Sequence, residues 1–150
     1  NKIQVVNLRL EHMYGTKDDD NKFVTWFLSQ LRKSVSNIEL TPGEQKRDFI
    51  YVDDVVSAYL TVLEKKKVLP GFSELDVGTG QLITVRKFVE KMVFLYQQSG
   101  AQVRTKLLFG AIPYRNGEMM SVDIDITGLK KIGWQSKICL DEGLNKIIKE

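Results

Sequence analysis

The sequence predicts a mixed α/β domain, and three observations support this prediction. The chain has 150 residues, 43% of them hydrophobic, which is enough for one compact domain with its own core. Short apolar runs typical of strands are separated by segments with helical periodicity, which is typical of α/β packing. Two strands lie close together in sequence and a long irregular loop comes late, so we do not expect a regular doubly wound arrangement.

The first third of the chain predicts a strand followed by an amphipathic helix. The chain opens without Met or a signal peptide, directly on the apolar run 3–8, and we expect that residue 1 is not a natural domain boundary. After the polar residues 17–20, residues 21–33 carry apolar side chains at helical spacing. The side chains of that stripe are Phe23, Trp26, Phe27, Leu28 and Leu31.

The middle of the chain predicts a strand, a turn, a second strand and a helix. Residues 38–41 form the first strand, Pro42-Gly43 forms the turn, and residues 47–52 form the second strand. The second strand leads straight into Asp53, which is a good N-cap for a helix over residues 54–66.

The rest of the chain continues this alternation. Residues 73–77 predict a strand, and Thr84 is the expected N-cap of a helix that ends near Gly100. Residues 103–109 predict another strand, followed by an aperiodic loop over residues 110–121. Two short helices are expected at residues 125–132 and 140–148.

Composition excludes several classes of function. The net charge is only +3 and the basic residues are scattered, so we expect no nucleic-acid partner. Cys139 is the single cysteine and His12 the single histidine, which excludes an internal disulfide and a Cys/His metal site. No apolar run reaches the roughly 18 residues of a membrane span, and we expect a soluble, cytoplasmic protein that does not contact membranes.

The chain carries little catalytic chemistry of its own. Gly78-Thr79-Gly80 lies between a strand and a helix, as a dinucleotide-binding turn would, but the third glycine of that fingerprint is missing. We interpret this segment as a tight turn that needs positive φ, and the helix N-terminus beyond it remains open as an anion site. None of the five tyrosines has a lysine four residues later, and no Ser, His and acid are spaced as a triad, so we expect no catalytic residue here.

Candidate binding residues occur where strands end, which is where α/β proteins bind ligands. Arg47 and Arg115 come from two separate irregular segments and can clamp a diphosphate, because the guanidinium fork matches phosphate oxygens. The alternative that each arginine only pairs with a nearby acid, Asp48 or Glu118, stays open. The irregular segments are residues 9–15, 43–54 and 113–118.

Three phrases stand out in order along the chain. They are LRLEHMYG at residues 8–15, GEQKRDFIYVDD at 43–54 and FGAIPYRNGE at 109–118. With residues 76–80 and 132–134, they resemble the C-terminal half of the extended short-chain dehydrogenases/reductases that act on nucleotide sugars, the NAD-dependent epimerase/dehydratase family. The resemblance covers essentially the whole chain. It implies the C-terminal part of an extended Rossmann-type dehydrogenase, a mixed α/β substrate-binding domain.

Within this family, the EHMYG and RNGEMM segments look most like the abequose and paratose synthases, which reduce a CDP-4-keto-3,6-dideoxyhexose at C4 in O-antigen (lipopolysaccharide) biosynthesis. The resemblance implies a nucleotide-diphosphate-sugar oxidoreductase, either an NAD(P)-dependent 4-keto reductase or an epimerase/dehydratase. A CDP-sugar is the favoured partner, with UDP- and dTDP-sugars as alternatives.

Carried over position by position, the resemblance implies that Arg47 and Arg115 bind the diphosphate. It also implies that Glu118 binds the nucleotide ribose or orients Arg115, and that Leu40 helps to wall the base.

Two further residues, His12 and Tyr14, lie at the first strand exit and are implied to line the phosphate–sugar side. A lone histidine at a strand end is more often a hydrogen-bond donor than an acid or base, and Tyr14 is open to a core role as well. His12 stands where the epimerases commonly have asparagine, which argues against a plain hexose 4-epimerase. Thr16 stands where the family usually has proline, which loosens the loop.

The family's cofactor loop and its Tyr-x-x-x-Lys pair belong to the preceding half, which is absent from this chain. That half would bind NAD or NADP and form most of a homodimer interface, and residues 1–15 and 73–80 would be strands of a sheet shared with it. The chain alone would then be inactive. A non-catalytic nucleotide-sugar-binding module and a purely structural α/β domain remain as alternatives. The base, the sugar, the choice of NAD or NADP and the reaction type stay open.

Overall fold

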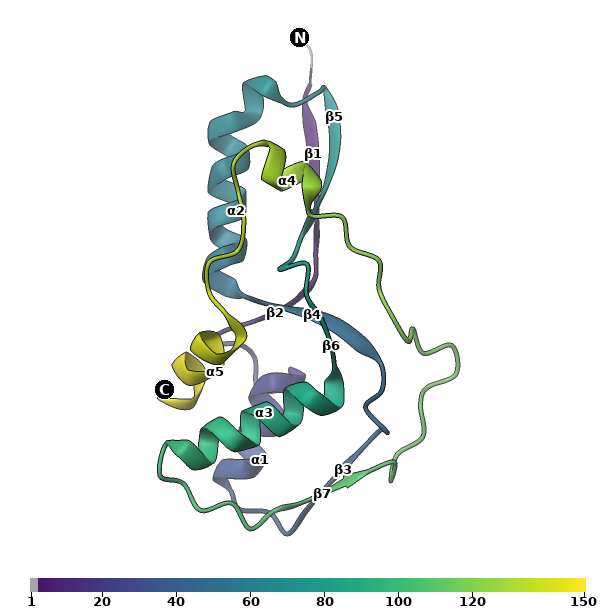
Figure 1. Cartoon of the computed structure of the whole chain (residues 1–150), viewed down its shortest axis with the longest axis vertical. Helices are drawn as coiled ribbons and strands as arrows, with labels where there is room; N and C mark the ends of the chain where they lie inside the picture. The colour runs from purple at the N-terminus through teal and green to yellow at the C-terminus, as the bar shows by residue number, and fades with distance from the viewer. Residues whose placement is uncertain (1–2) are drawn as a thin grey trace.

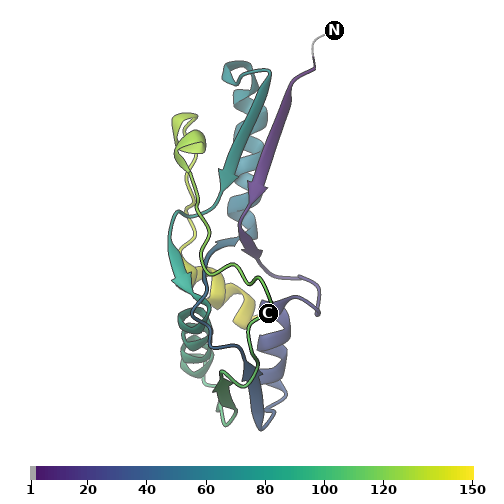
Figure 2. The ribbon, with the colours of Figure 1, turned by 90° about the vertical axis from the view of Figure 1, so that its right-hand side faces the viewer.

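The computed structural model describes residues 3–150 and shows an elongated molecule in which strands connect two packed ends (Figures 1 and 2). At one end, β1 (Val5–Leu10) pairs in parallel with β5 (Phe72–Val77). The long helix α2 (Val52–Lys65) and the short helix α4 (Thr127–Lys131) lie against this pair, and a single 3-10 turn, η1 (Lys66–Val68), follows α2.

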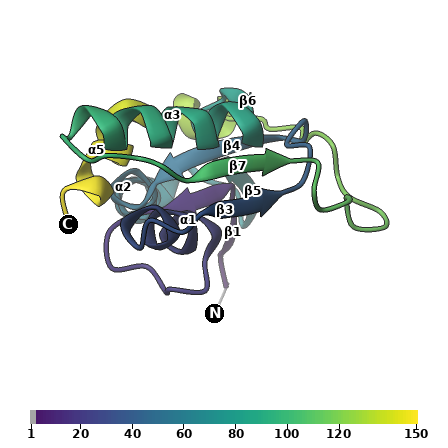
Figure 3. The same cartoon turned by 90° about the horizontal axis from the view of Figure 1, so that it is seen from below.

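The opposite end holds three helices and a second parallel pair of strands. The helices are α1 (Phe23–Arg32), α3 (Val85–Gln98) and α5 (Leu140–Ile148). The strands are β3 (Asn37–Leu40) and β7 (Lys106–Phe109), which pair with each other in parallel. Seen from below, β3 and β7 run side by side between α3 and α1 (Figure 3).

A three-stranded sheet connects the two ends. Its central strand is β4 (Lys46–Tyr51), which pairs in parallel with β2 (His12–Tyr14) and antiparallel with β6 (Leu82–Thr84). The two closely spaced strands of the sequence, β3 and β4, therefore pair with different partners and do not form a hairpin. The strand β6 was not expected, because three residues directly before a helix give no readable alternation.

Successive residues of β4 point into two separate hydrophobic cores. Phe49 and Tyr51 belong to the core between α1, α3 and α5, whereas Ile50 belongs to the core beneath α2 and β5. Side chains of a strand alternate between its two faces, so this one strand can serve both. The sequence predicted a single core, and the structure corrects this to two cores on opposite sides of β4.

The strand expected over residues 1–15 is divided in the structure, with residues 1 and 2 outside the described part. The Glu11 N–H donates to Val77 O at 3.1 Å, and the Met13 N–H donates to Glu11 O at 2.7 Å, which closes a local turn. The chain leaves β5 at this point and continues as β2 beside β4. Similarly, the expected strand over 73–80 ends as β5 at Val77.

The two predicted N-caps differ in outcome. The Thr84 hydroxyl accepts a hydrogen bond from the Lys87 N–H at 3.2 Å, so this cap is confirmed. Asp53 is not an N-cap, because α2 already begins at Val52 and Asp53 lies within its first turn. Its neighbour Asp54 is buried and accepts hydrogen bonds from the backbone of Lys137 and Ile138, which ties the segment before α5 to α2.

The Gly78-Thr79-Gly80 segment is a tight turn, as predicted. Gly80 has a φ of 77°, and its N–H donates to the Asp48 carboxylate at 2.7 Å. The Thr79 hydroxyl donates to the other oxygen of that carboxylate, also at 2.7 Å. A Cβ at Gly78 would lie 2.7 Å from Asp48, so the turn closes around this buried acid.

No helix within residues 3–150 combines the length and the apolar character needed to span a bilayer.

Candidate functional site

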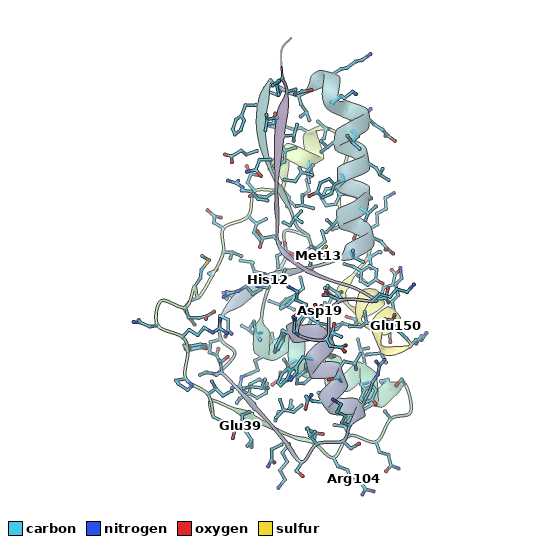
Figure 4. The ribbon with its side chains drawn as sticks, turned by 180° about the vertical axis from the view of Figure 1, so that it is seen from behind. His12, Met13, Asp19, Glu39, Arg104 and Glu150 are labelled. Carbon is cyan, nitrogen blue, oxygen red and sulfur yellow. The ribbon has the colours of Figure 1, made fainter. Side chains whose placement is uncertain are left out.

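A cavity of about 360 Å³ opens between β3, β4, β7, α1 and the start of α3, beside the loop over residues 110–121. Figure 4 labels two of its lining residues, His12 beyond the end of β1 and Glu39 on β3. Apolar and aromatic side chains form much of its wall, and a few polar groups interrupt them, as is typical of ligand sites. The wall includes Phe23, Trp26, Leu40, Phe49, Val85, Val89, Phe109 and Ile112.

The polar part of the cavity is built around Arg47 and Glu118. The Arg47 guanidinium lies 2.7 Å from a Glu118 carboxylate oxygen, and the two side chains are 10% and 23% exposed. A second guanidinium nitrogen donates to Lys46 O at 2.7 Å. These contacts use only part of the five donors of the fork, so the rest can bind an anion in the cavity.

The structure shows which acid pairs with Arg47. Arg47 does pair with an acid, but that acid is Glu118 and not its neighbour Asp48, which faces the Gly78–Gly80 turn. The side chain of Glu118 binds Arg47 and not Arg115, and its expected contact with the nucleotide ribose stays a prediction. Backbone contact supports the pair, because the Lys46 N–H donates to Met120 O at 2.8 Å and holds the loop beside β4.

Arg115 lies apart from this cavity. Its side chain is exposed, and it forms no hydrogen bond or ion pair with any of residues 3–150. Its backbone closes a local turn, in which the Glu118 N–H donates to Arg115 O at 3.0 Å, while the Tyr114 hydroxyl accepts from the Glu44 N–H at 2.9 Å. The structure does not assemble the predicted clamp of Arg47 and Arg115, because the loop carries Arg115 outward.

His12 lines the cavity beside Phe49, with the two rings edge to face at 5.8 Å. Burial lowers the pKa of His12 below its usual value of 6.5, and the nearby charge of Arg47 lowers this pKa further. The carboxylates of Asp48 and Glu118 oppose this shift in part. The lowered pKa favours the neutral form of His12 at pH 7.

Tyr14 is part of the core and not of the cavity. Its side chain is only 2% exposed and packs edge to face against Tyr51 at 5.6 Å and Phe88 at 5.9 Å. Its hydroxyl donates to Leu140 O at 3.4 Å, and burial raises its pKa far above the usual value. The register of β2 on β4 places Tyr14 opposite Tyr51, which explains why the ring turns into this core.

Of the six predicted site residues, the structure brings together His12, Leu40, Arg47 and Glu118. Sequence reasoning missed the aromatic wall, although Phe23 and Trp26 lie at the edge of the helical stripe, with 37% and 36% exposure. It also missed Gln45, Phe109 and Ile112, for which the sequence offers little signal. The guanidinium of Arg86 lies over the ring of Phe109, 3.9 Å from its centre.

The chain is similar to proteins of known name over nearly its whole length. It is 40% identical to the CDP-abequose synthase of Salmonella typhimurium over 147 residues, which cover 98% of this chain and 48% of the relative. It is 34% identical to the CDP-abequose synthase of Salmonella muenchen over 143 residues, which cover 95% of this chain and 46% of the relative. The chain thus spans about half the length of these relatives.

Solved structures agree with this similarity. MoeE5 in complex with UDP-glucuronic acid and NAD has a TM-score of 0.79 and 26% identity, with 97% of this chain and 46% of that chain covered. The Thermotoga maritima UDP-glucose 4-epimerase with UDP-glucose has a TM-score of 0.78 and 26% identity, with 96% of this chain and 44% of that chain covered. This confirms the predicted Rossmann-type, mixed α/β fold.

The family described as "NAD dependent epimerase/dehydratase family" matches residues 1–78, and the chain belongs to that family.

Proposed function

We propose that this chain is the substrate-binding part of a nucleotide-diphosphate-sugar oxidoreductase. The reaction is an NAD(P)-dependent 4-keto reduction, or an epimerisation or dehydration, in the biosynthesis of a surface polysaccharide such as O-antigen. One observation carries the proposal: a partly buried guanidinium, already fixed by an ion pair, faces an aromatic-walled cavity of about 360 Å³. That combination suits a ligand with a flat ring at one end and a charged diphosphate nearby.

Each part of the cavity then has a task in binding. Arg47 holds the diphosphate, and Leu40 forms part of the wall against the base. Glu118 fixes Arg47, and its carboxylate also accepts a hydrogen bond from a ribose hydroxyl. His12 stands on the phosphate side as a neutral donor. Contacts to these remote parts of the substrate can hold a sugar carbon in position for reaction, which raises turnover as well as affinity.

The residues of this chain do not fit a dinucleotide cofactor at the Gly78–Gly80 turn. The Gly80 N–H is occupied by Asp48, and that carboxylate would repel a pyrophosphate placed there. We therefore place the NAD or NADP site, together with the acid–base residues, in a part of the protein outside this chain. The relatives are about twice as long as this chain, which leaves room for such a part.

A CDP-sugar is the substrate class that the relatives favour, because the two CDP-abequose synthases are 40% and 34% identical to this chain. UDP- and dTDP-sugars are the alternatives. The two relatives are named as synthases, which does not favour the alternative of a non-catalytic binding module.

The experiment is a calorimetric titration of CDP, UDP and dTDP into the natural protein that carries this sequence. Wild type should bind CDP, and Arg47→Met should weaken that binding at least about tenfold, since a charge-assisted contact is lost. Arg104→Met is the matched control, because Arg104 is exposed at the lower tip of the molecule in Figure 4 and is not among the residues that line the cavity. Absence of nucleotide binding in wild type, or equal affinities in both variants, would contradict the proposal.

A further inference from the structure

Gln45 carries a buried hydrogen-bond acceptor that nothing in the described chain satisfies. The residue lies directly before β4 and is 8% exposed. Its side-chain N–H donates to the Thr41 hydroxyl at 3.3 Å. Its carbonyl oxygen, Oε1, finds no hydrogen-bond partner among residues 3–150. Native proteins leave few buried polar atoms unpaired, so this oxygen calls for an explanation.

The backbone around Gln45 is held on both sides. The Val85 N–H donates to Gln45 O at 2.9 Å, and the neighbouring Lys46 N–H donates to Met120 O at 2.8 Å. The amide group therefore stands on a fixed frame between the start of α3 and the late loop. An unpaired acceptor on a backbone held in this way needs only a small side-chain adjustment to accept a hydrogen bond from a ligand.

Gln45 lines the same cavity as Arg47 and Glu118. Residues two apart along an extended segment share one face and lie about 6–7 Å from each other, so Gln45 is one step along the wall from Arg47. Leu40, Val85 and Phe109 supply apolar surface in the same cavity. A diphosphate on Arg47 has the nucleoside on one side and the sugar on the other, and the apolar side chains that line the cavity with Gln45 suit the flat, less polar nucleoside.

The geometry points to Gln45 as a nucleoside-binding residue, whose Oε1 accepts a hydrogen bond from the ligand. This inference rests on the proposed function, because it takes the cavity to be the nucleotide site. A nucleoside offers two kinds of donor, an N–H of the base and an O–H of the ribose. In cytosine the exocyclic amine is a donor, whereas uracil has an acceptor carbonyl at that ring position, so the two sources predict different selectivity.

Gln45→Met is the informative variant, because methionine has a similar length and no hydrogen-bonding amide. It removes both the unpaired acceptor and the long hydrogen bond to the Thr41 hydroxyl, so in the absence of nucleotide the melting temperature should change little. Its affinity for CDP should fall about fivefold or more, the usual effect of one lost hydrogen bond. Gln81→Met is the control, because Gln81 is exposed, lies outside this cavity and should leave both quantities unchanged.

Titration of CDP and UDP into wild type and Gln45→Met shows whether the base or the ribose donates the hydrogen bond to Gln45. If the exocyclic amine of cytosine donates, CDP loses more affinity than UDP, and the ratio of their dissociation constants changes. If the ribose donates, both lose affinity equally. A melting temperature that falls with CDP binding unchanged would assign Gln45 a structural role and overturn the inference.

Failure of the inference is distinguishable from failure of the proposed function. If wild type binds neither CDP nor UDP, the proposed function is wrong, and the assignment of Gln45 falls with it. If wild type binds and Gln45→Met binds equally well, only the assignment of Gln45 is wrong. A measurement on wild type covers the case in which Gln45→Met does not fold: the ¹⁵N and ¹H resonances of the Gln45 amide should shift on addition of CDP, and unmoved resonances would overturn the inference.

Discussion

The guanidinium of Arg47 lies 2.7 Å from the carboxylate of Glu118, although the two residues are 71 positions apart in sequence. This ion pair joins β4 to the late loop and gives the cavity a fixed cation. It is more than a surface ion pair, because the Arg47 side chain is only 10% exposed. The shape of the cavity depends on this contact, and so does the diphosphate binding that we propose for Arg47.

Glu118→Gln tests the contribution of this pair to stability. The substitution keeps the shape of the side chain but leaves the guanidinium of Arg47 without a counter-charge. We expect the free energy of unfolding to fall by about 1–2 kcal/mol in urea denaturation at pH 7, allowing for the partial exposure of the pair. Glu44→Gln is the control, since Glu44 is exposed and 3.6 Å from Arg86, and should cost less than about 0.5 kcal/mol. Equal losses in the two variants would refute this.

Arg115→Met tests whether Arg115 binds the diphosphate, a point on which the structure and the family resemblance lead to different expectations. The resemblance implies that Arg115 binds the diphosphate with Arg47, whereas the structure places Arg115 outside the cavity. We therefore expect Arg115→Met to weaken CDP binding by less than about threefold, well below the loss for Arg47→Met. Calorimetry on the natural protein measures both variants. A loss as large as that of Arg47→Met would mean that the loop over residues 110–121 closes onto the ligand.

Tyr14→Phe tests whether Tyr14 serves the core or the ligand. The hydroxyl makes one long hydrogen bond of 3.4 Å to Leu140 O, so its removal should lower the free energy of unfolding by less than about 1 kcal/mol. The affinity for CDP and the turnover of the natural enzyme should not change. A clear loss of turnover with stability unchanged would return Tyr14 to the binding site.

The pH dependence of CDP binding should show whether His12 contacts the diphosphate. The pKa of His12 lies below its usual value of 6.5, so the ring is neutral at pH 7. A bound diphosphate favours the protonated ring, and affinity should rise as the pH falls below about 6.5. His12→Gln should flatten this rise in a calorimetric series over pH. If the wild-type and variant profiles coincide, His12 does not contact the diphosphate.

The lowered pKa of His12 also affects the stability of the unliganded protein. Here a fall in pH is unfavourable, whereas it strengthens CDP binding. The unfolded state takes up the His12 proton more readily than the folded state does. The stabilising contribution is therefore complete above the usual pKa of 6.5 and is lost as the pH falls through the lowered pKa. His12→Gln should reduce this loss in denaturant melts.

The sequence was sufficient for those parts of the fold that depend on local patterns. The helices α1, α2 and α3, the Thr84 cap and the tight turn at Gly80 follow from periodicity, capping chemistry and glycine conformation. Asp53 was wrong as a cap because the helix begins two residues earlier than predicted, directly after β4, so that Tyr51 is the residue before it. The division of the core was also missed, because alternation along β4 shows that both faces are buried but not what each face meets.

The candidate site was predicted in part for the same reason. Arg47, Glu118, His12 and Leu40 stand in phrases that resemble a known family, and the structure brings all four to one cavity. Which acid pairs with Arg47 depends on a contact across 71 residues, which no local pattern reveals. The buried oxygen of Gln45 is invisible in sequence, because an unpaired acceptor exists only once the fold is formed.

The most direct test of this account is a crystal structure of the natural protein with CDP bound. We predict density for the nucleotide in the cavity, with the diphosphate on Arg47 and the base against Leu40. Density at another place on the chain, with the Arg47–Glu118 cavity empty, would contradict the account.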